Sequence, residues 1–286
     1  MKHFCMIANT RTNATEEDVA EIRRLIEKRG GTLVVLPGRD PATLGAAREG
    51  FTDLAFLPED AEACLVLGGD GTVLQAAREL DGALPILGIN LGTLGFLAEV
   101  ERENLEEAID ALFDGDYLEE KRLMLHGKVF REGTCIYEGN ALNDIVVTRS
   151  GFSRIILTEV LIDGSRLGGY SGDGMILSTP TGSTGYNLAA GGPVMLPDSK
   201  VFAVTPICPH SLNAKGIVIP SGSRVELRVE QSKKTQKDEA IVTFDGNQGI
   251  PVTVGDRIEA EKAETVTTFL KLPGSRFLDT LRNKMM

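Results

Sequence analysis

The sequence predicts an α/β plus β protein, in which an N-terminal doubly wound parallel α/β domain precedes a C-terminal, mainly antiparallel β domain. Two patterns along the 286 residues carry this prediction. Over residues 1–120, short continuous apolar runs alternate with amphipathic segments, which is typical of a parallel sheet covered by helices on both faces. Over residues 121–265, apolar and polar residues alternate between Gly and Asp-Gly turns, which is typical of antiparallel strands.

The elements of the N-terminal domain follow from its apolar runs and helix signals. Strands are predicted over residues 3–9, 32–37, 64–68 and 84–90, and helices over residues 15–31, 72–80 and 101–115. Thr15 is the predicted N-cap of the first helix, and Gly30 its end. Residues 38–63 are ambiguous and are expected to hold a partial helix and loops.

The C-terminal domain is predicted from three alternating segments, residues 127–151, 153–180 and 222–263. The charged stretch 231–239 is interpreted as the solvated tip of a hairpin. Residues 266–286 return to a strand, a Pro-Gly turn and a short helix, which we expect to pack back on the N-terminal domain.

Composition and charge exclude several classes of function. A formal net charge of −11 argues against broad binding to nucleic acid or to a membrane surface, so phosphates must be held locally. The apolar stretches are too short to span a membrane, the N-terminus is interpreted as a strand, and we expect a cytoplasmic protein. The three histidines do not have the spacing of zinc ligands. The cysteines are expected to be buried free thiols: Cys5, Cys64, Cys135 and Cys208.

The stretch "CLVLGGDGTVLQ", residues 64–75, places one carboxylate, Asp70, among glycines at the end of an apolar strand. Ligands of open α/β sheets bind at such an edge, where the next helix offers free N–H groups. Gly68, Gly69 and Gly71 would let a phosphate approach the backbone. Thr72 can cap the helix.

Asp70 itself is not suited to binding a phosphate. Two negative charges ~4 Å apart repel by roughly 4 kcal/mol at an effective dielectric constant of 20. A carboxylate here can hold a metal carried by the phosphate, or accept a proton from a hydroxyl that attacks it. The alternative is a tight strand–turn–helix junction with Asp70 as a polar filler. Neither standard nucleotide-binding glycine fingerprint is present.

Three further motifs carry polar side chains of the kind that ligands use. Residues 168–193 repeat the first arrangement, with Asp173 between glycines and a Ser/Thr/Gly loop before a short helix at Tyr186. The pair Asn143-Asp144 suits two ribose hydroxyls, although an Asx turn explains it equally well. The run 245–247 is most simply a hairpin turn, and the Ser/Thr/Gly loop could equally be a capping arrangement.

Taken together, these motifs resemble those of the NAD kinase family. The resemblance covers residues 62–249 and rests on "GGDGT" (68–72), "LGINLGTLGFLAEV" (87–100), Asn143-Asp144, "DGMILSTPTGSTGYNLAAGGP" (173–193) and "TPICPHSLNAKGIVIP" (205–220). The acid-centred glycine motif is shared with diacylglycerol- and sphingosine-type lipid kinases. The stretch 179–193 is far more specific, and it favours the NAD kinases.

The resemblance implies an enzyme that transfers the γ-phosphoryl group of ATP (or polyphosphate) to the 2′-hydroxyl of the adenosine ribose of NAD, giving NADP. It implies that residues 121–265 form the NAD-binding domain and that the active site lies between this domain and residues 1–120. It further implies a homodimer or homotetramer, with Mg²⁺ carried by ATP rather than bound directly by the protein. Neither nucleic acid nor a membrane is an expected partner.

The same resemblance implies a role for individual residues. Asp70 would be the general base, Leu74 and Phe96 would border NAD, and Asn143 and Asp144 would hold ribose hydroxyls. The remaining implied contacts to substrate or nucleotide are Gly69, Gly71, Thr72, Arg154, Asp173, Thr184, Gly185, Tyr186, Asn187, Leu188, Ala189, Asp245 and Asn247.

The chain departs from the family pattern at four places. Asp144 is shorter than the usual Glu, Gly185 replaces a common Ala, and Lys215-Gly216 replaces a frequent Arg-Pro. Ser171 stands where many members have an Arg, which affects a phosphate contact or the preference between NAD and NADH.

Two other functions remain compatible with the motifs. A lipid kinase would keep Asp70 as the base but would need an apolar pocket and a membrane-docking face, against which the charge of −11 argues. A non-catalytic nucleotide sensor would bind the ligand and leave Asp70 without a role.

Overall fold

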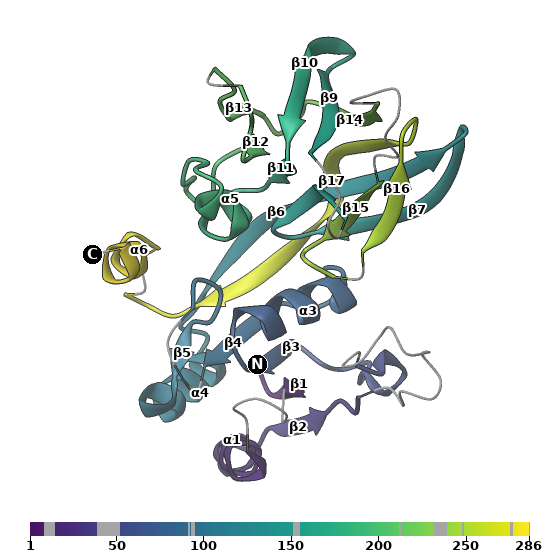
Figure 1. The fold of residues 1–286 in the computed structure, drawn as a ribbon. Helices are drawn as coiled ribbons and strands as arrows, with labels where there is room; N and C mark the ends of the chain where they lie inside the picture. The colour runs from purple at the N-terminus through teal and green to yellow at the C-terminus, as the bar shows by residue number, and fades with distance from the viewer. Residues whose placement is uncertain are drawn as a thin grey trace. The chain divides into compact units, whose positions relative to one another are not determined.

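The computed structural model describes residues 1–8, 15–38, 52–90, 92, 95–150, 155–211, 213–231, 239–247, 249–274 and 277–285 (Figure 1). The chain divides into two compact units. Unit 1 comprises Met1–Arg122 and Thr267–Met286, and unit 2 comprises Leu123–Val266. The long strands β6 and β17 each contribute residues to both units.

Unit 1 is built on a parallel sheet with the strand order β2-β1-β3-β4. These strands are β1 (His3–Ala8), β2 (Thr32–Val35), β3 (Ala63–Leu67) and β4 (Ile86–Asn90). The short β5 (Val100–Glu101) and the end of β17 (Arg257–Lys271) also pair with β4 in parallel. The helices are α1 (Glu16–Lys28), α3 (Asp70–Leu80), α4 (Leu105–Asp114) and α6 (Phe277–Met285), with 3₁₀ turns η1 (Leu54–Phe56) and η2 (Arg102–Asn104).

Helices cover both faces of this sheet, as the sequence predicts. Leu87 and Ile89 of β4 belong to a buried apolar cluster with residues of α1 and α4. Gly88, between them, points to the opposite face, where an added Cβ would lie 3.3 Å from Val73 of α3. Because successive side chains of a strand alternate between faces, α3 lies opposite α1 and α4. The predicted doubly wound α/β architecture is therefore confirmed.

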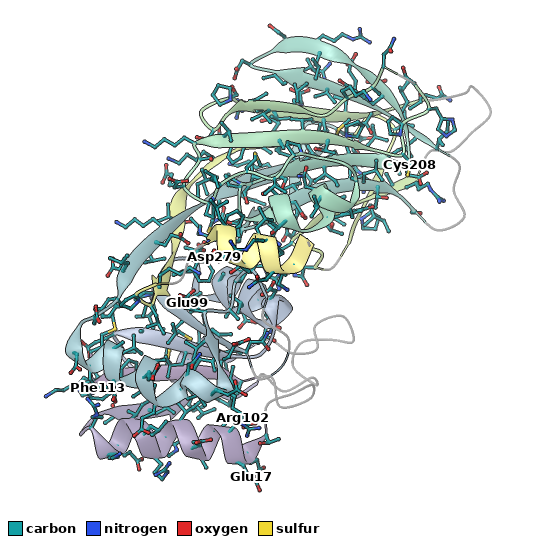
Figure 2. The ribbon with its side chains drawn as sticks, turned by 90° about the vertical axis from the view of Figure 1, so that its left-hand side faces the viewer. Glu17, Glu99, Arg102, Phe113, Cys208 and Asp279 are labelled. Atoms are coloured by element: carbon teal, nitrogen blue, oxygen red, sulfur yellow. The ribbon has the colours of Figure 1, made fainter. Side chains whose placement is uncertain are left out.

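The ends of α1 form as expected, whereas the start of α3 does not. Thr15 caps α1 through a capping box with Asp18, and the helix ends before Gly30 at φ +75°. Arg102, labelled in Figure 2, pairs with the buried Asp18 carboxylate.

The prediction that Thr72 caps α3 is wrong. Gly69 occupies the N-cap without a side-chain hydrogen bond, and Thr72 lies inside the first turn.

Unit 2 contains two antiparallel arrangements of strands. One has the order β13-β12-β11-β8-β15-β16, formed by β8 (Asp144–Arg149), β11 (Gly174–Ser178), β12 (Val201–Ile207), β13 (Ile217–Pro220), β15 (Glu239–Phe244) and β16 (Ile250–Thr253). The other has β10-β9-β14-β17, with β6 beside β17 and β7, formed by β6 (Leu118–Arg131), β7 (Thr134–Ala141), β9 (Ile156–Ile162), β10 (Ser165–Gly172) and β14 (Val225–Glu230) besides β17. Their inner faces share one apolar core, so the predicted antiparallel β domain is confirmed.

Asp-Gly pairs form tight turns in unit 2, but one predicted hairpin does not exist. Asp163 and Gly164 both have positive φ between β9 and β10, as a two-residue hairpin turn requires. The stretch 231–239 was expected to be a hairpin tip. This expectation is wrong, because β14 before it and β15 after it pair in different sheets. Residues 232–238 themselves lie outside the described part.

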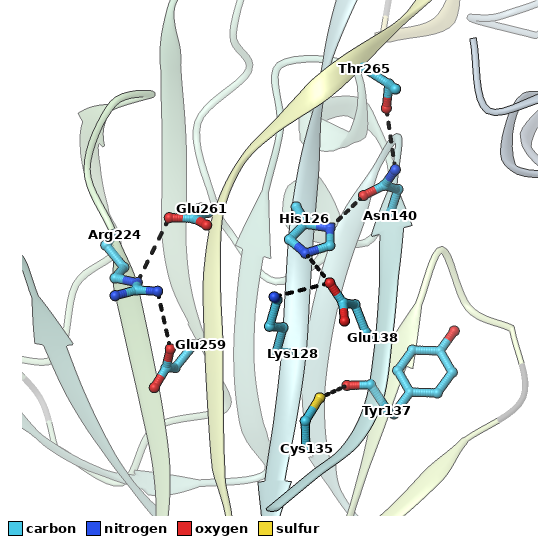
Figure 3. A network of polar contacts seen from close by, with 10 residues as sticks. All are labelled: His126, Lys128, Cys135, Tyr137, Glu138, Asn140, Arg224, Glu259, Glu261 and Thr265. Atoms are coloured by element: carbon cyan, nitrogen blue, oxygen red, sulfur yellow. Dashed lines mark hydrogen bonds and ion pairs between the residues drawn. The ribbon is translucent and has the colours of Figure 1, made fainter. Parts of the chain in front are cut away.

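A chain of polar side chains follows the β6, β7 and β17 strands on one face (Figure 3). His126 lies between Asn140, at 2.8 Å, and Glu138, at 3.0 Å, while Lys128 also contacts Glu138 at 3.0 Å. Asn140 donates in turn to Thr265. Exposed ion pairs of this kind contribute about 0–1 kcal/mol each, so we interpret the network as a solvated face.

All four cysteines are free, as expected, but only Cys5 and Cys64 are buried; Cys135 and Cys208 are exposed. Across the described parts of the chain, no helix has both the length and the apolar character needed to cross a membrane.

Candidate active site

Asp70 is the first residue of α3 and follows β3 after two glycines. All five residues of β3 are buried, so the strand is fixed in the core and ends at a defined point. The N-terminus of α3 presents free backbone N–H groups and the positive end of the helix dipole there. The sequence therefore places one half-buried carboxylate at the edge of the sheet where a phosphate-bearing ligand is favoured.

The Asp70 carboxylate is held by the backbone of a distant loop. One oxygen accepts a hydrogen bond from the Phe96 N–H at 2.8 Å and the other from the Leu97 N–H at 3.1 Å. A Cβ added at Gly95 would lie 1.7 Å from the same carboxylate. The segment 95–97 thus fixes the direction of Asp70, and each oxygen keeps a further lone pair. Sequence patterns did not predict this arrangement.

The three glycines around Asp70 serve different purposes. At Gly68, where φ is +157°, a Cβ would lie 2.5 Å from the Thr72 hydroxyl. Gly69 and Gly71 have open space where a Cβ would be, and Gly69 has an ordinary φ of −82°. Open space beside the first turn of α3, rather than unusual backbone conformation, therefore distinguishes Gly69 and Gly71.

The two apolar residues predicted to border NAD, Leu74 and Phe96, are both half-buried in unit 1. The Phe96 ring lies 6.2 Å from the Phe277 ring of α6, and Lys284 Nζ lies 5.2 Å from its centre. Phe96 also lines a cavity of about 250 Å³ together with residues such as Glu99 and Phe277.

In unit 2, Asp245 organises the Asn143-Asp144 pair. Its carboxylate accepts hydrogen bonds from the N–H groups of Leu142 at 2.9 Å, Asn143 at 2.7 Å and Asp144 at 3.2 Å. Asp245 itself has a φ of +52° in a turn closed by Asn247 N–H and Phe244 O at 3.1 Å. The expected turn is confirmed, and the Asp245 carboxylate has a clear structural role.

Asp144 and Asn143 carry polar atoms whose surroundings are unusual. Burial, with the nearby charge of Asp245, raises the pKa of the Asp144 carboxyl to about 7. The Asn143 Oδ1 atom is buried and has no hydrogen-bond partner among the described residues. An unsatisfied buried acceptor costs roughly 1–3 kcal/mol, so these side chains are strong candidates to bond ligand hydroxyls.

Asp173 lies beside Arg149, a residue that the sequence did not single out. Arg149 Nε lies 2.8 Å from Asp173 Oδ1, because the β8–β11 register pairs Thr148 with Gly174 and brings the next residues together. Both side chains remain about one-third exposed. Position 171 is Ser where many family members have Arg, yet the Arg149 guanidinium lies beside Asp173. This contact follows from the strand register, which the sequence alone does not show.

Tyr186 begins the short helix α5 (Tyr186–Ala189) and is 45% exposed. Burial of part of the ring raises the pKa of its hydroxyl, and the nearby Cys208 raises it further. The carboxylates of Asp173 and Asp144 act in the same direction. The structure therefore brings Asp144, Asp173 and Tyr186 into one neighbourhood of unit 2.

Asn187 lies inside the loop rather than on its surface. It is fully buried, donates to the Ser183 carbonyl at 3.3 Å and the Pro193 carbonyl at 3.0 Å, and accepts from the Thr205 hydroxyl at 2.7 Å. A Cβ at Gly192 would lie 2.1 Å from its Oδ1. Its side chain holds the loop together and has no donor left for a ligand.

The other predicted residues of this loop are more accessible. Gly185 and Ala189 are exposed, and Thr184 and Leu188 are half-buried. A Cβ at Gly185 would lie 3.4 Å from the Gly182 carbonyl, an ordinary contact, so the Ala common in the family would fit here. Arg154 lies outside the described residues.

No group of three or more His, Cys, Asp or Glu side chains that could hold a metal ion occurs among the residues that the structure describes. Unit 1 thus offers an oriented carboxylate at an open helix N-terminus, and unit 2 offers a cluster of carboxylates, an amide and a phenol. These are features of enzymes that act on nucleotides, with a base for a hydroxyl and polar groups for a ribose.

Two family models match this chain, and both describe the same class of protein. The family model described as "ATP-NAD kinase N-terminal domain" matches residues 7–117, and "ATP-NAD kinase C-terminal domain" matches residues 142–272. An NAD kinase of Lachnoclostridium phytofermentans is 45% identical over 288 residues, covering 99% of both chains.

Two solved structures share the fold. A yeast NADH kinase complexed with NADH has a TM-score of 0.84 at 23% identity, covering 99% of this chain and 88% of its own. An NAD kinase from Archaeoglobus fulgidus in complex with ATP has a TM-score of 0.75 at 24% identity, covering 99% and 98%. The chain belongs to the NAD kinase family, as its motifs predict, and its activity is the phosphorylation of NAD.

Proposed function

We propose that Asp70 accepts the proton of the 2′-hydroxyl of the adenosine ribose of NAD while that oxygen attacks the γ-phosphoryl group of ATP. The oriented Asp70 carboxylate beside the open Gly69 and Gly71 is the observation that carries this proposal. A bond forms between the ribose oxygen and the γ-phosphorus, and the bond from that phosphorus to ADP breaks. The products are NADP, ADP and a protonated Asp70, which then releases its proton to solvent.

The chemistry demands little of the protein beyond positioning. The transition state of phosphoryl transfer is loose, and the attacking and leaving oxygens lie on opposite sides of the γ-phosphorus. A sugar hydroxyl is a far weaker acid than a carboxyl group, so we expect proton transfer to Asp70 to be late and Asp70 to contribute roughly 10²–10⁴-fold. The N-terminus of α3 favours the negative charge of the phosphates beside it.

Unit 2 would bind NAD. We assign the ribose hydroxyls to Asn143 and Asp144, whose backbone Asp245 holds in place. Arg149 pairs with Asp173 and offsets its charge, while Tyr186 offers an exposed ring to NAD. Gly185 and its neighbours in the loop would lie against the ligand through their backbone.

The phosphoryl donor and its metal ion carry opposite charges and are expected to bind together. ATP is the donor we propose, and the Archaeoglobus fulgidus relative was solved with ATP. Mg²⁺ keeps most of its water ligands and binds through substrate phosphates, so we propose that it enters with ATP. Bound there, it would neutralise charge on the phosphates. The yeast relative was solved with NADH, which makes NADH a second acceptor to test.

We further propose that the protein acts in the cytoplasm as a homodimer or homotetramer. Free thiols suit a reducing compartment, since all four cysteines of the chain are unpaired. Sedimentation velocity would determine the assembly.

The test of the proposed base is Asp70→Asn. We expect NADP formation from NAD and Mg²⁺-ATP to fall by roughly 10²–10⁴-fold, with NAD binding by calorimetry retained. An amide has one oxygen acceptor where the carboxylate has two, so Asp70→Glu is the companion variant: it keeps both acceptors but moves them. Asp114→Asn, the same change at an exposed site on α4, is the control. Wild-type turnover in Asp70→Asn would refute the assignment.

A further inference from the structure

The C-terminal helix α6 contacts the loop that holds Asp70. Phe277 and Lys284 are seven residues apart, so two helical turns place them on one face. This face meets Phe96, with the two aromatic rings 6.2 Å apart and Lys284 Nζ 5.2 Å from the Phe96 ring centre. Figure 2 marks α6 by Asp279. A side chain near the end of the chain therefore touches the residue whose own N–H bonds the Asp70 carboxylate.

The loop around Phe96 is anchored on one side by the core and on the other by this contact. Leu97 and Ala98 are buried, and the Glu99 N–H bonds the Gly88 carbonyl of β4. Gly95, on the other side, has no side chain that could anchor it. The Phe96 ring is the first side chain after Gly95, and it contacts Phe277 and Lys284 of α6.

A second connection ties the chain before α6 to the same loop. Glu99, whose side chain is 3% exposed, pairs with Lys271 at 2.5 Å and accepts the Leu272 N–H at 3.1 Å. A cavity of about 250 Å³ lies between these groups and α6, with Phe277 and Thr280 on its wall. Phe277 lies on the wall of this cavity and makes an apolar contact from α6 to the loop through the Phe96 ring.

We propose that Phe277 is a positioning residue for phosphoryl transfer. It fixes the Phe96 ring, and through the N–H groups of Phe96 and Leu97 it sets the direction of the Asp70 carboxylate. The inference rests on the proposed role of Asp70 as the base. A small misplacement of a base lowers turnover without weakening substrate binding, because the loss falls on the transition state.

The experiment compares three variants in the full-length protein. Phe277→Ala should lower kcat for NADP formation by about tenfold, with KM for NAD and for ATP changed by less than about twofold. Phe277→Tyr keeps the ring and should restore at least about half of kcat. Leu278→Ala, at the neighbouring residue that is 61% exposed, should match wild type.

A measurement independent of activity accompanies the kinetics. Amide hydrogen exchange at Phe96 and Leu97 should be about tenfold faster in Phe277→Ala than in wild type and normal in Phe277→Tyr, since the hydrogen bonds to Asp70 are loosened. Wild-type kcat, or unchanged exchange at both amides, in Phe277→Ala would overturn the inference. An equal loss of kcat in Phe277→Ala and Phe277→Tyr would also overturn the inference. Failure of Asp70→Asn to lower turnover would instead overturn the proposed base, while the exchange experiment would still report on the contact.

Discussion

At the scale of single residues, the direction of Asp70 depends on a position that has no side chain. Gly95 lies so close to the carboxylate that any Cβ would overlap it, whereas Gly69 and Gly71, next to Asp70 in sequence, have open space instead. The glycine that matters for orientation is thus 25 residues away, and the adjacent glycines matter for access.

Gly95→Ala should therefore abolish the present orientation of the Asp70 carboxylate. We expect kcat for NADP formation to fall by about 100-fold, because the carboxylate must rotate away from the N–H groups of Phe96 and Leu97. Gly222→Ala is the matched control, since a Cβ there meets open space. Turnover near wild type for Gly95→Ala, with an unchanged melting curve, would contradict this explanation.

Asp144 should make stability depend on pH. Its pKa is about 7 in the folded protein, above the usual 3.8, so between these values the folded state keeps a proton that the unfolded state releases. Stability from this group is complete below about pH 4 and is lost as the pH rises through 7, by about 4 kcal/mol at most.

The variant Asp144→Asn removes this dependence. We expect its free energy of unfolding, relative to wild type, to rise by a few kcal/mol between about pH 5 and pH 8, measured by urea titration. Asp116→Asn, on an exposed side chain, should keep the wild-type dependence. A difference between Asp144→Asn and wild type that is the same at both pH values would show that Asp144 ionises normally.

At the scale of elements, the loop between β11 and β12 is organised from inside. Asn187 joins the 3₁₀ turn η3 (Gly182–Thr184), the Pro193 segment and β12 through three hydrogen bonds. Tyr186 and Gly185 are exposed on a loop that these internal hydrogen bonds hold together. A pattern of small and hydroxyl residues indicates such a loop, but not which members face inward.

Asn187→Ala should accordingly act through stability. We expect a loss of about 3 kcal/mol in the free energy of unfolding, because buried partners in Ser183, Pro193 and Thr205 lose their bonds. The exposed Asn213→Ala should change stability by less than about 0.5 kcal/mol. Unchanged stability with a raised KM for NAD would instead make Asn187 a direct ligand contact, as the resemblance to the family implies.

At the scale of the whole molecule, the net charge of −11 bears on the choice of phosphoryl donor. A long polyphosphate carries far more negative charge than ATP and is repelled more strongly by an acidic protein. Salt screens this repulsion over a Debye length of about 10 Å at 0.1 M.

We expect ATP to be used at least about tenfold more efficiently than polyphosphate at low ionic strength, as kcat/KM at fixed free Mg²⁺. Added KCl should raise the value for polyphosphate and change that for ATP much less. A polyphosphate rate that falls with salt would indicate a local basic groove and contradict the prediction.

Regular elements were predictable because their causes are local. The capping box at Thr15, the buried run of β3 and the positive φ values at Asp163-Gly164 depend on residues a few positions apart. The expected hairpin over 231–239 failed because the partners of a strand are chosen by the whole sheet. Thr72 is not the cap because α3 begins two residues earlier, at Asp70, with Gly69 as its N-cap.

By itself, the sequence determined the two kinds of domain, the family and the positions of Asp70, Asp144 and Asp173, since short motifs carry that information. Tertiary structure alone decided what holds these groups: backbone N–H groups at Asp70, the neighbouring Asp245 at Asp144 and Arg149 at Asp173. Each of these partners lies more than twenty residues away along the chain. Such contacts arise from strand register and loop closure, which depend on the packing of the whole domain and leave no periodic trace in the sequence.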